Sequence, residues 1–434
     1  MPFSEAPSDK RKCALVLSLV FPPDAVSTAQ LFGEVVEDLA AHSWRVVVLT
    51  TKPHYNLDQS RRQAQPLTDI WGGLLATSTF GGSAVLHTAM PKKNAGIAGR
   101  LAAWAGFHFL SVVAALFKVG RVDVILAPSP PLTIGIAAWL IGLIKGAPFI
   151  YNVQELYPDA AIRLGVLQEG VTARLLRGVE RFVYRQAYAI TTIAPRMHSA
   201  VVSRVSHSSK VRLIPNFVDT REIAPRPKDN PFSREFSLSD RFIVLYAGNM
   251  GPAQGLETLI DAAEGTRDHP RIVYVLVGGG TLRERLLVSV RAKGLPNVTF
   301  VPPQPYERMP DIYGASDLCL VPLARGLTAE AIPSKIYRIM AAERTVLALV
   351  DPDSDVAQVV RDSGSGIVVE AGDAIALSKA VLKAAADADQ APGKRGRQYV
   401  LTHASRDAVT RMYSDLLQEA LDGRAGRATQ QAAP

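Results

Sequence analysis

Two glycine-bearing turns in the second half of the chain have the character of a phosphate-binding site. The first turn, GNMGPAQG, follows an apolar run at 242–247, and the second, GGG, follows an apolar run at 271–277. Glycine allows a phosphate to approach the backbone closely, and amide N–H groups at the start of a helix attract an anion. Glycine also ends strands without any ligand, but two such turns in tandem favour a nucleotide. The candidate anion-binding glycines are Gly248, Gly251, Gly278, Gly279 and Gly280.

Neither the carboxylates nor the histidines have the spacing of a metal site. Asp351 and Asp353 flank one proline and begin a turn rich in Pro, Asp and Ser, which is ordinary turn chemistry. Two carboxylates alone rarely hold Mg²⁺, and the 8 histidines show no ligand pattern such as H-E-x-x-H. We therefore expect no metal and no cofactor apart from the substrate itself.

Strands and helices alternate along the whole chain. The expected strands are Cys13–Val20, Val46–Thr50, Val122–Ala127, Phe149–Val153, Ala189–Ile193, Val211–Ile214, Phe242–Ala247, Val273–Val277, Val298–Val301, Leu318–Val321, Val346–Val350 and Gly366–Val369. Continuous apolar strands separated by helices predict parallel sheets that are covered on both faces. The sequence therefore predicts an α/β fold with two doubly wound domains, each built on about six strands.

Composition places the chain among globular proteins of a reducing compartment. The 434 residues are 48% hydrophobic and 20% charged, which suits two or three domains with large cores. The 2 cysteines, Cys13 and Cys319, fall in expected strands, and the N-terminus shows no apolar leader segment. The polar stretch 219–240 is the expected linker, and the tail from Gly423 is expected to be disordered.

The positive charge is concentrated in the first half of the chain. Residues 1–215 carry 22 Lys/Arg against 13 Asp/Glu, while the whole chain has a net charge of +8. Such a surface suits anionic lipid or nucleic acid, but no nucleic-acid-binding motif is present. The apolar stretch Leu101–Phe117 is flanked by Arg100 and Lys118. It is expected to be a core helix or, as alternatives in decreasing order, an interfacial helix or a membrane span.

Seven short motifs together resemble one enzyme family. Phe21-Pro22-Pro23, the strand at 45–50, NVQELYPD at 152–159, IPNFVD at 214–219, YAGNMGPAQGLE at 246–257, VLVGGG at 275–280 and Pro333-Ser334-Lys335 occur in this order. They are similar to retaining glycosyltransferases of family 4, in the subgroup that builds bacterial O-antigen, capsule or exopolysaccharide. The resemblance runs from about Cys13 to Leu421. It implies the GT-B fold, in which two Rossmann-like domains face each other across a cleft.

The resemblance also implies how the chain is divided. Residues 1–218 would bind the acceptor and associate with the membrane, and residues 219–396 would bind the nucleotide-sugar donor. A helix at 397–422 would cross back to the first domain, and 423–434 would be a disordered tail.

The chain departs from the family pattern in the donor loop and in a pair of glutamates. The family usually has Arg and Lys in the first donor loop, where this sequence has the neutral residues Asn249 and Gln254. The two family glutamates fall on Glu330 and Arg338, so ribose binding by the second cannot be transferred to this chain. Positive charge is therefore absent at 249 and 254 but present at 338, so the sequence moves this charge and does not lose it.

Lys335 is the residue most expected to carry that charge. Pro333 suits the first position of a helix, which puts Ser334 and Lys335 in its first turn. A cation there is disfavoured by the helix dipole unless an anion compensates, and a diphosphate would do so. The alternative is a lysine that reaches into water. Arg338 shares its face at i+3, and Glu330 would bind a sugar hydroxyl or lie on a loop surface.

The first domain is expected to supply the acceptor site and a catalytic carboxylate. Gln154, Glu155 and Asp159 follow an expected strand, at the end where open α/β sheets bind ligands. Glu155 would accept a proton or stabilise positive charge at the anomeric carbon, or would be an ion-paired or helix-capping carboxylate. Ser27 and Thr28 would contact the acceptor or cap the following helix.

The function implied is metal-independent transfer of a sugar from a nucleotide diphosphate to a lipid-linked saccharide. The acceptor would be linked to a polyprenyl diphosphate, and the enzyme would be cytoplasmic, peripheral on the inner face of the membrane. Two alternatives remain: a nucleotide-sugar 2-epimerase of the same architecture, and a subunit that has lost catalysis. Turnover of donor with and without lipid acceptor distinguishes all three.

Overall fold

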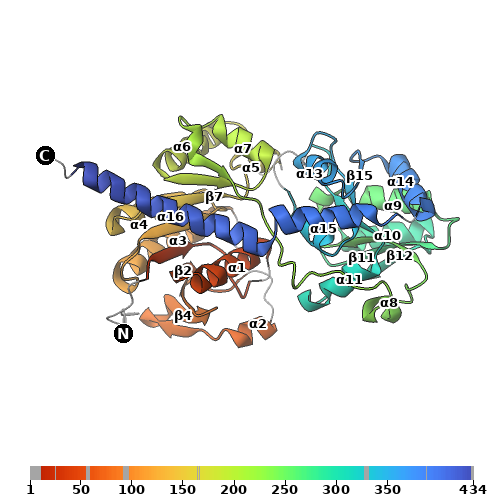
Figure 1. Ribbon diagram of the computed structural model, residues 1–434, viewed down its shortest axis with the longest axis horizontal. Coiled ribbons are helices and arrows are strands. Elements are labelled where there is room, and N and C mark those ends of the chain that lie inside the picture. The colour runs from red at the N-terminus through yellow and green to blue at the C-terminus, as the bar shows by residue number, and fades with distance from the viewer. Residues whose placement is uncertain are drawn as a thin grey trace. The chain divides into compact units, whose positions relative to one another are not determined.

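The computed structural model forms two compact units, each built around its own sheet. It describes residues 11–24, 26–54, 59–90, 97–163, 165, 167–326, 332–387 and 389–431. The first unit combines Met1–Pro215 with Val409–Pro434, and the second is Asn216–Ala408. Figure 1 shows the elements of each unit.

Within the described residues, the sheet of the first unit has nine strands in the order β3-β4-β5-β2-β1-β6-β7-β8-β9. These strands are β1 Cys13–Leu17, β2 Arg45–Thr51, β3 Thr68–Ile70, β4 Leu75–Phe80, β5 Ser83–Thr88, β6 Val124–Pro128, β7 Phe149–Val153, β8 Ala189–Thr192 and β9 Val211–Leu213. The central strands are apolar and fully buried because helices cover both faces of the sheet.

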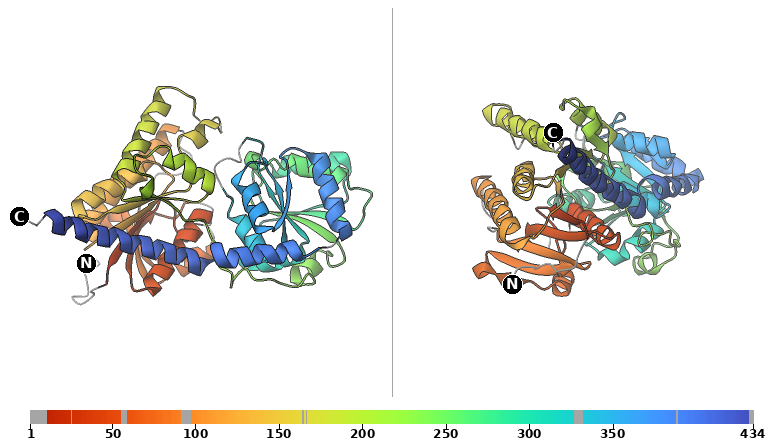
Figure 2. Two further views of the ribbon diagram at one scale, coloured as in Figure 1. Left: turned by 45° about the horizontal axis from the view of Figure 1, so that its top comes forward. Right: turned by 60° about the vertical axis from the view of Figure 1, so that its left-hand side comes forward.

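The helices of the first unit connect these strands. They are α1 Ser27–Ala41, α2 Gln59–Ala64, α3 Ile97–Lys118, α4 Ile134–Lys145, α5 Asp159–Arg163, α6 Val171–Gln186 and α7 Pro195–Val202, with the 3₁₀ turns η1 Trp71–Gly73 and η2 Ser208–Lys210. The long helix α16, Arg406–Gln431, packs along the first unit (Figure 2). Its Tyr413 hydroxyl accepts a hydrogen bond from the Asn152 side chain on β7.

The sequence analysis missed three strands of this sheet. β3 and β4 are antiparallel, whereas β5 pairs in parallel with β2. Their sequences TDI, LATSTF and SAVLHT are short and mix polar with apolar residues, so they lack the continuous apolar run of a buried parallel strand. The prediction of about six strands was therefore too low for this sheet.

The sheet of the second unit is fully parallel, as expected, in the order β12-β11-β10-β13-β14-β15. Its strands are β10 Phe242–Ala247, β11 Ile272–Val277, β12 Val298–Val301, β13 Leu318–Pro322, β14 Thr345–Leu349 and β15 Gly366–Val369. The helices are α8 Pro231–Glu235, α9 Glu257–Glu264, α10 Arg283–Lys293, α11 Met309–Ala315, α12 Lys335–Ala341, α13 Asp355–Ser363, α14 Ala374–Asp387 and α15 Ala391–His403, with the 3₁₀ turns η3 Pro252–Gln254 and η4 Tyr306–Arg308.

Two chain segments differ from the expected organisation. The stretch 219–240, expected to be a linker, contains α8, whose N-cap residue Asn230 accepts hydrogen bonds from two backbone N–H groups. The expected helix at 397–422 is instead divided between α15 and α16, and α16 continues past Gly423, where disorder was expected.

Each sheet has a switch point at its centre, where the strand order changes direction. In the first unit the order reverses between β1 and β6, and in the second unit between β10 and β13. Open α/β sheets bind ligands at such a switch point, outside the carboxyl ends of the strands. The loops after these four strands are therefore the first places to search for a site.

Candidate functional site

The two glycine turns of the second unit pack against each other. A Cβ atom on Gly278 would lie 2.1 Å from the carbonyl oxygen of Gly248, and one on Gly280 would lie 2.4 Å from that of Met250. The Met250 N–H donates to the Gly279 carbonyl at 2.7 Å. Gly278 and Gly280 also have φ values of +140° and +144°, which favour glycine. Loop packing alone therefore explains these two glycines.

Several amides that were expected to face a phosphate are occupied by the protein. The N–H groups of Gly248 and Gly278 donate to Val277 and Val301, and that of Gly251 donates to the Gln254 side-chain oxygen at 3.0 Å. These amides do not form the expected cradle.

Lys335 places a cationic side chain at the same edge of the sheet. Its Nζ lies 4.3 Å from the centroid of the Tyr246 ring at the end of β10. A Cβ atom on Gly248 would lie 2.8 Å from this Nζ, so glycine at 248 leaves room for the ammonium group. Within the described chain, no carboxylate forms an ion pair with Lys335.

Arg338 lies one turn further along α12 and adds a second cation. Its guanidinium is 5.2 Å from the centroid of the Tyr306 ring. Burial, and then the charge of Arg338, lower the pKa of Lys335 from 10.5 to about 8. Two cations that raise each other's energy form a site that an anion would stabilise.

The remaining predicted donor residues have different surroundings. Asn249 is exposed, and its backbone carbonyl accepts a hydrogen bond from the Tyr246 hydroxyl. Ser334 is the N-cap residue of α12 and makes no side-chain capping bond, so the helix begins at Lys335 and not at Pro333 as predicted. Glu330 lies outside the described residues.

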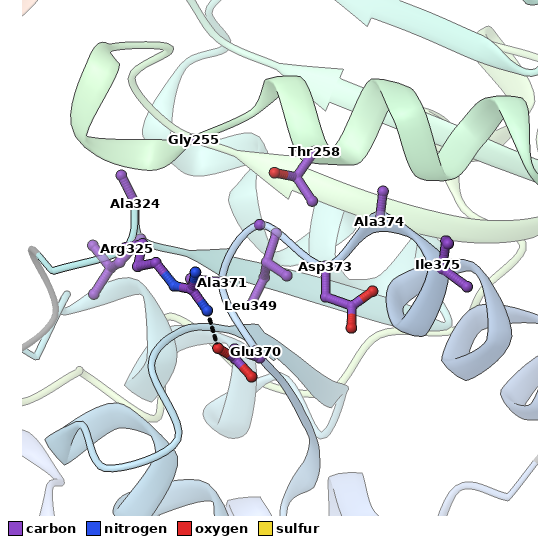
Figure 3. Close-up of a pocket in the computed structure, with 12 residues that line it drawn as sticks. Gly255, Thr258, Ala324, Arg325, Leu349, Glu370, Ala371, Asp373, Ala374 and Ile375 are labelled. Carbon is purple, nitrogen blue, oxygen red and sulfur yellow. Dashed lines mark hydrogen bonds and ion pairs between the residues drawn. The ribbon is translucent and has the colours of Figure 1, made fainter.

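A pocket of about 660 Å³ lies in the second unit (Figure 3). It is lined by Gly255, Thr258, Leu323, Ala324, Arg325, Leu349, Glu370, Ala371, Gly372, Asp373, Ala374 and Ile375. The loops after β10 and β13 both contribute, so it adjoins the switch point, but none of the described donor residues predicted from sequence lines it. Arg325 is ion-paired with Glu370, and Asp373 adds a further negative charge. The charge of this pocket therefore suits an anion less well than that of Lys335 and Arg338.

In the first unit, Glu155 and Gln154 follow β7 as predicted. Glu155 is exposed, yet desolvation by the surrounding protein raises the pKa of its carboxyl. Gln154 is buried, and its amide donates to the Asn152 side chain at 2.7 Å. Glu155 is thus the one of the two that is open to a ligand.

Asp159, predicted to contact the acceptor, belongs to an ion-pair network. Its carboxylate lies 2.6 Å from Arg204 and 3.4 Å from Arg177. Arg204 also holds the buried Glu180 at 2.8 Å. These contacts give Asp159 a structural role that the sequence did not predict.

Ser27 and Thr28 begin α1 but do not cap it. The N-cap position is occupied by Val26, without a side-chain hydrogen bond. Ser27 is exposed at the first helical residue, close in sequence to the end of β1.

Sequence reasoning missed a polar group at the carboxyl end of β2. The His54 backbone N–H donates to the buried Asp24 carboxylate at 2.9 Å. The only sequence signal was a histidine immediately after an apolar strand, in the segment TTKPHY.

The described residues show neither a metal cluster nor a membrane-spanning helix. Among them, no group of three or more His, Cys, Asp or Glu side chains could hold a metal ion. Asp351 accepts a hydrogen bond from the Gly326 N–H at 2.9 Å, as a turn residue does. No helix in the described part of the chain is long and apolar enough to cross a bilayer.

Comparison with known proteins identifies the family. Residues 228–399 match the family model of glycosyl transferases group 1, and residues 28–216 match that of a glycosyl transferase 4-like domain. The chain belongs to the group 1 glycosyltransferases of the GT-B fold. The family resemblance and the fold predicted from sequence are thereby confirmed.

One relative and two solved structures illustrate this similarity. The chain is 26% identical over 356 residues to WcaI of Escherichia coli strain K12, a glycosyl transferase assigned to colanic acid biosynthesis; the match covers 80% of this chain and 85% of WcaI. Sucrose-phosphate synthase from Thermosynechococcus elongatus has a TM-score of 0.72 at 19% identity, covering 95% and 100% of the two chains. HepE from Anabaena, in complex with UDP-glucose, has a TM-score of 0.70 at 14% identity, covering 94% and 99%. The two structures support the fold alone.

Proposed function

We propose that this protein transfers a hexose-type sugar, with retention, from a nucleotide diphosphate to a saccharide hydroxyl. The observation that carries the proposal is the pair of cations at the switch point of the second unit. Lys335 is desolvated over an aromatic ring, and Arg338 lies one turn away on the same helix. Positive charge that is already in place lowers the energy of a departing diphosphate, because it needs no reorganisation during the reaction.

The position of this charge accounts for the neutral donor loop. Lys335 and Arg338 would stabilise the diphosphate in place of the cations that the family usually has at 249 and 254. In the reaction, the bond between the anomeric carbon and the phosphate oxygen breaks as the acceptor oxygen bonds to the same face. The acceptor proton would pass to a donor phosphate oxygen, and Glu155, which is exposed after β7, would stabilise positive charge at the sugar.

The acceptor in this proposal is a polyprenyl-diphosphate-linked saccharide of bacterial surface polysaccharide synthesis. Support comes from the similarity to WcaI, whose name places it in colanic acid biosynthesis. The UDP-glucose complex of HepE supports a nucleotide-sugar donor. The absence of a metal requirement is part of the same proposal, because two cationic side chains supply the charge that a metal would otherwise supply.

We further propose that the first unit binds an anionic membrane surface through α3, α4 and α6. α4 packs against both other helices, and Trp139 on α4 contacts Phe182 on α6 edge to face at 5.0 Å. Large apolar side chains are exposed on all three helices, including Phe117 at 68%, Leu143 at 63% and Leu175 at 66%.

Basic side chains border these apolar residues. Lys118 follows Phe117 and lies over the Trp71 ring, and α6 carries the exposed residues Arg174 and Arg181. Apolar insertion beside basic residues is the pattern of a peripheral helix on anionic lipid. The protein would then work at the cytoplasmic face of the inner membrane.

A donor screen tests the proposed function. Purified protein is incubated with UDP- and GDP-linked sugars, with and without membranes that contain lipid-linked saccharides. Acceptor-dependent release of nucleoside diphosphate is expected. Epimerised donor without acceptor would support the epimerase instead, and no turnover with any donor would support an inactive subunit.

A further inference from the structure

The proposed reaction does not use the pocket of the second unit. Its volume of about 660 Å³ lies within the range of small-molecule sites, which is about 300–1,000 Å³. The pocket lies at the carboxyl end of the sheet, where the loops after β10, β13 and β15 meet, and the starts of α9 and α14 complete its wall. Of the described residues that line it, none belongs to the cation pair Lys335 and Arg338.

Hydrogen-bonded backbone forms the wall of this pocket on two sides. On one side, the Ala324 N–H donates to the Ala253 carbonyl at 2.9 Å, which joins the loop after β13 to η3. A Cβ atom on Gly255 would lie 3.4 Å from the Ala324 Cα, so the two loops are also in contact there. On the other side, the Asp373 carboxylate accepts from the Ala376 N–H at 2.8 Å and so holds the first turn of α14. The pocket is therefore a built cavity of the fold.

The pocket is lined by polar groups that the fold itself does not use. Within the described residues, the Thr258 hydroxyl makes no hydrogen bond, and only one oxygen of the Asp373 carboxylate does. Arg325 and Glu370 form an ion pair, with side chains that are 72% and 48% exposed (Figure 3). An ion pair at this exposure contributes little to stability, so folding alone does not account for these charges.

Apolar side chains lie among these polar groups. Leu349 and Ala371 line the pocket and are buried. Ile375, in the first turn of α14, is 71% exposed, the highest exposed fraction of any large apolar side chain that the structure describes. An apolar wall with a few convergent polar groups is the usual composition of a small-molecule site.

The charges of the pocket select the kind of ligand. Glu370 and Asp373 outnumber the single cation Arg325, so a phosphate would be repelled. A wholly apolar ligand would desolvate charged groups and leave them without new partners. We propose that the pocket binds an uncharged saccharide. Its hydroxyl groups donate to the two carboxylates and accept from Arg325, Thr258 supplies a further hydroxyl, and the C–H groups of the sugar contact Ile375.

This saccharide site goes beyond the proposed reaction, because it contains neither of the cations assigned to the donor diphosphate. It rests on the proposed function only for the source of its ligand, which is the glycan under synthesis. A site of this kind holds part of that glycan on the second unit while transfer takes place. Binding and transfer are measured separately, so the failure of one is distinguishable from the failure of the other.

Two substitutions remove polar groups of the pocket without removing its wall. Thr258→Val deletes the hydroxyl and leaves a side chain of nearly the same shape. Asp373→Asn removes the charge and keeps an oxygen that can accept from the Ala376 N–H, since asparagine is as good as aspartate at the start of a helix. Asp268→Asn is the matched control, because Asp268 is exposed in the turn after α9 and does not line the pocket.

The assay is saturation-transfer NMR on the full chain. The probes are maltose, lactose and the methyl glycosides of glucose, galactose, mannose and fucose, and at least one is expected to bind the parent. For that probe, Asp373→Asn is expected to raise the Kd about 10-fold or more, the effect of losing a charged acceptor, and Thr258→Val about 3- to 10-fold. Asp268→Asn is expected to stay within about twofold of the parent. UDP and GDP are expected to leave the probe bound.

Three results overturn the saccharide site. In the first, none of the probes binds the parent. In the second, Thr258→Val and Asp373→Asn bind the probe as tightly as the parent does, which would place the sugar elsewhere. In the third, UDP or GDP displaces the probe, which would make the pocket part of the donor site. All three leave the proposed function intact, whereas probe binding without transfer from any donor contradicts the proposed function alone.

Discussion

We predict that the charge of Lys335 destabilises the ligand-free protein and favours the binding of an anion. Its pKa falls from 10.5 in the unfolded chain to about 8 in the folded protein, mainly because the ammonium is desolvated. At about 1.4 kcal/mol per pH unit, the charged form is disfavoured on folding by about 3 kcal/mol. The contact with the Tyr246 ring returns about 0.5–2 kcal/mol.

The substitution Lys335→Met removes the charge but keeps a flexible chain of similar length. At pH 7 the variant is expected to have a free energy of unfolding about 1–3 kcal/mol above the parent. The size of this difference depends on pH. Below pH 8 the folded parent carries the full cost of the charge, and between pH 8 and 10.5 the cost disappears as the folded parent loses its proton first. The advantage of the variant should therefore shrink across that window.

Activity is expected to change in the opposite direction. Removing one preorganised charge from a leaving-group site costs about 10²–10³ in rate. Chemical denaturation at pH 7, 9 and 10.5, with steady-state kinetics at pH 7, measures both quantities. Lys379→Met, on the exposed face of α14, is the control and should change stability by less than about 0.5 kcal/mol. A Lys335→Met variant that is less stable than the parent at every pH, and that turns over within a few-fold of it, would refute the reasoning.

Three further predictions follow from the same structure. Activity should survive EDTA, because Lys335 and Arg338 supply the charge; loss of turnover that Mg²⁺ or Mn²⁺ restores would contradict this. In vesicle co-sedimentation, the protein should bind anionic but not neutral lipid, and salt and Phe117→Ser should both weaken this binding. Ile375→Ser, at an exposed apolar residue of the second unit, is the control and should not weaken it. Equal binding to both lipids would exclude the electrostatic contribution. The pKa of His87 is about 4 in the folded protein and 6.5 in the unfolded chain, so the free energy of unfolding should fall by up to about 3 kcal/mol as the pH falls from 6.5 to 4. A His87→Gln variant whose free energy of unfolding has the same dependence on pH as that of the parent would contradict this.

The second sheet was more predictable from sequence than the first, for a physical reason. A central parallel strand such as β10 is buried on both faces, so it appears as a continuous apolar run, and its predicted bounds agree with the structure. β4 and β5 belong to a partly polar edge, where composition resembles that of a loop. Periodicity alone cannot identify such strands.

The candidate site was predictable only in part. Sequence placed Lys335 and Arg338 one turn apart on a helix, but not the Tyr246 and Tyr306 rings beneath them, which come from distant segments. It also did not show that Gly278 and Gly280 lie against Gly248 and Met250, a contact that by itself requires glycine there. The positions of these rings and the contact between the two glycine turns depend on tertiary structure, which local sequence patterns do not encode.

The most direct test of the account is an NMR measurement of the donor and of the sugar product. A donor of known anomeric configuration is incubated with the protein, with and without lipid-linked saccharide. The account predicts that nucleoside diphosphate is released only when the acceptor is present, and that the new glycosidic bond has the anomeric configuration of the donor. An inverted linkage, or conversion of donor without any acceptor, would contradict it.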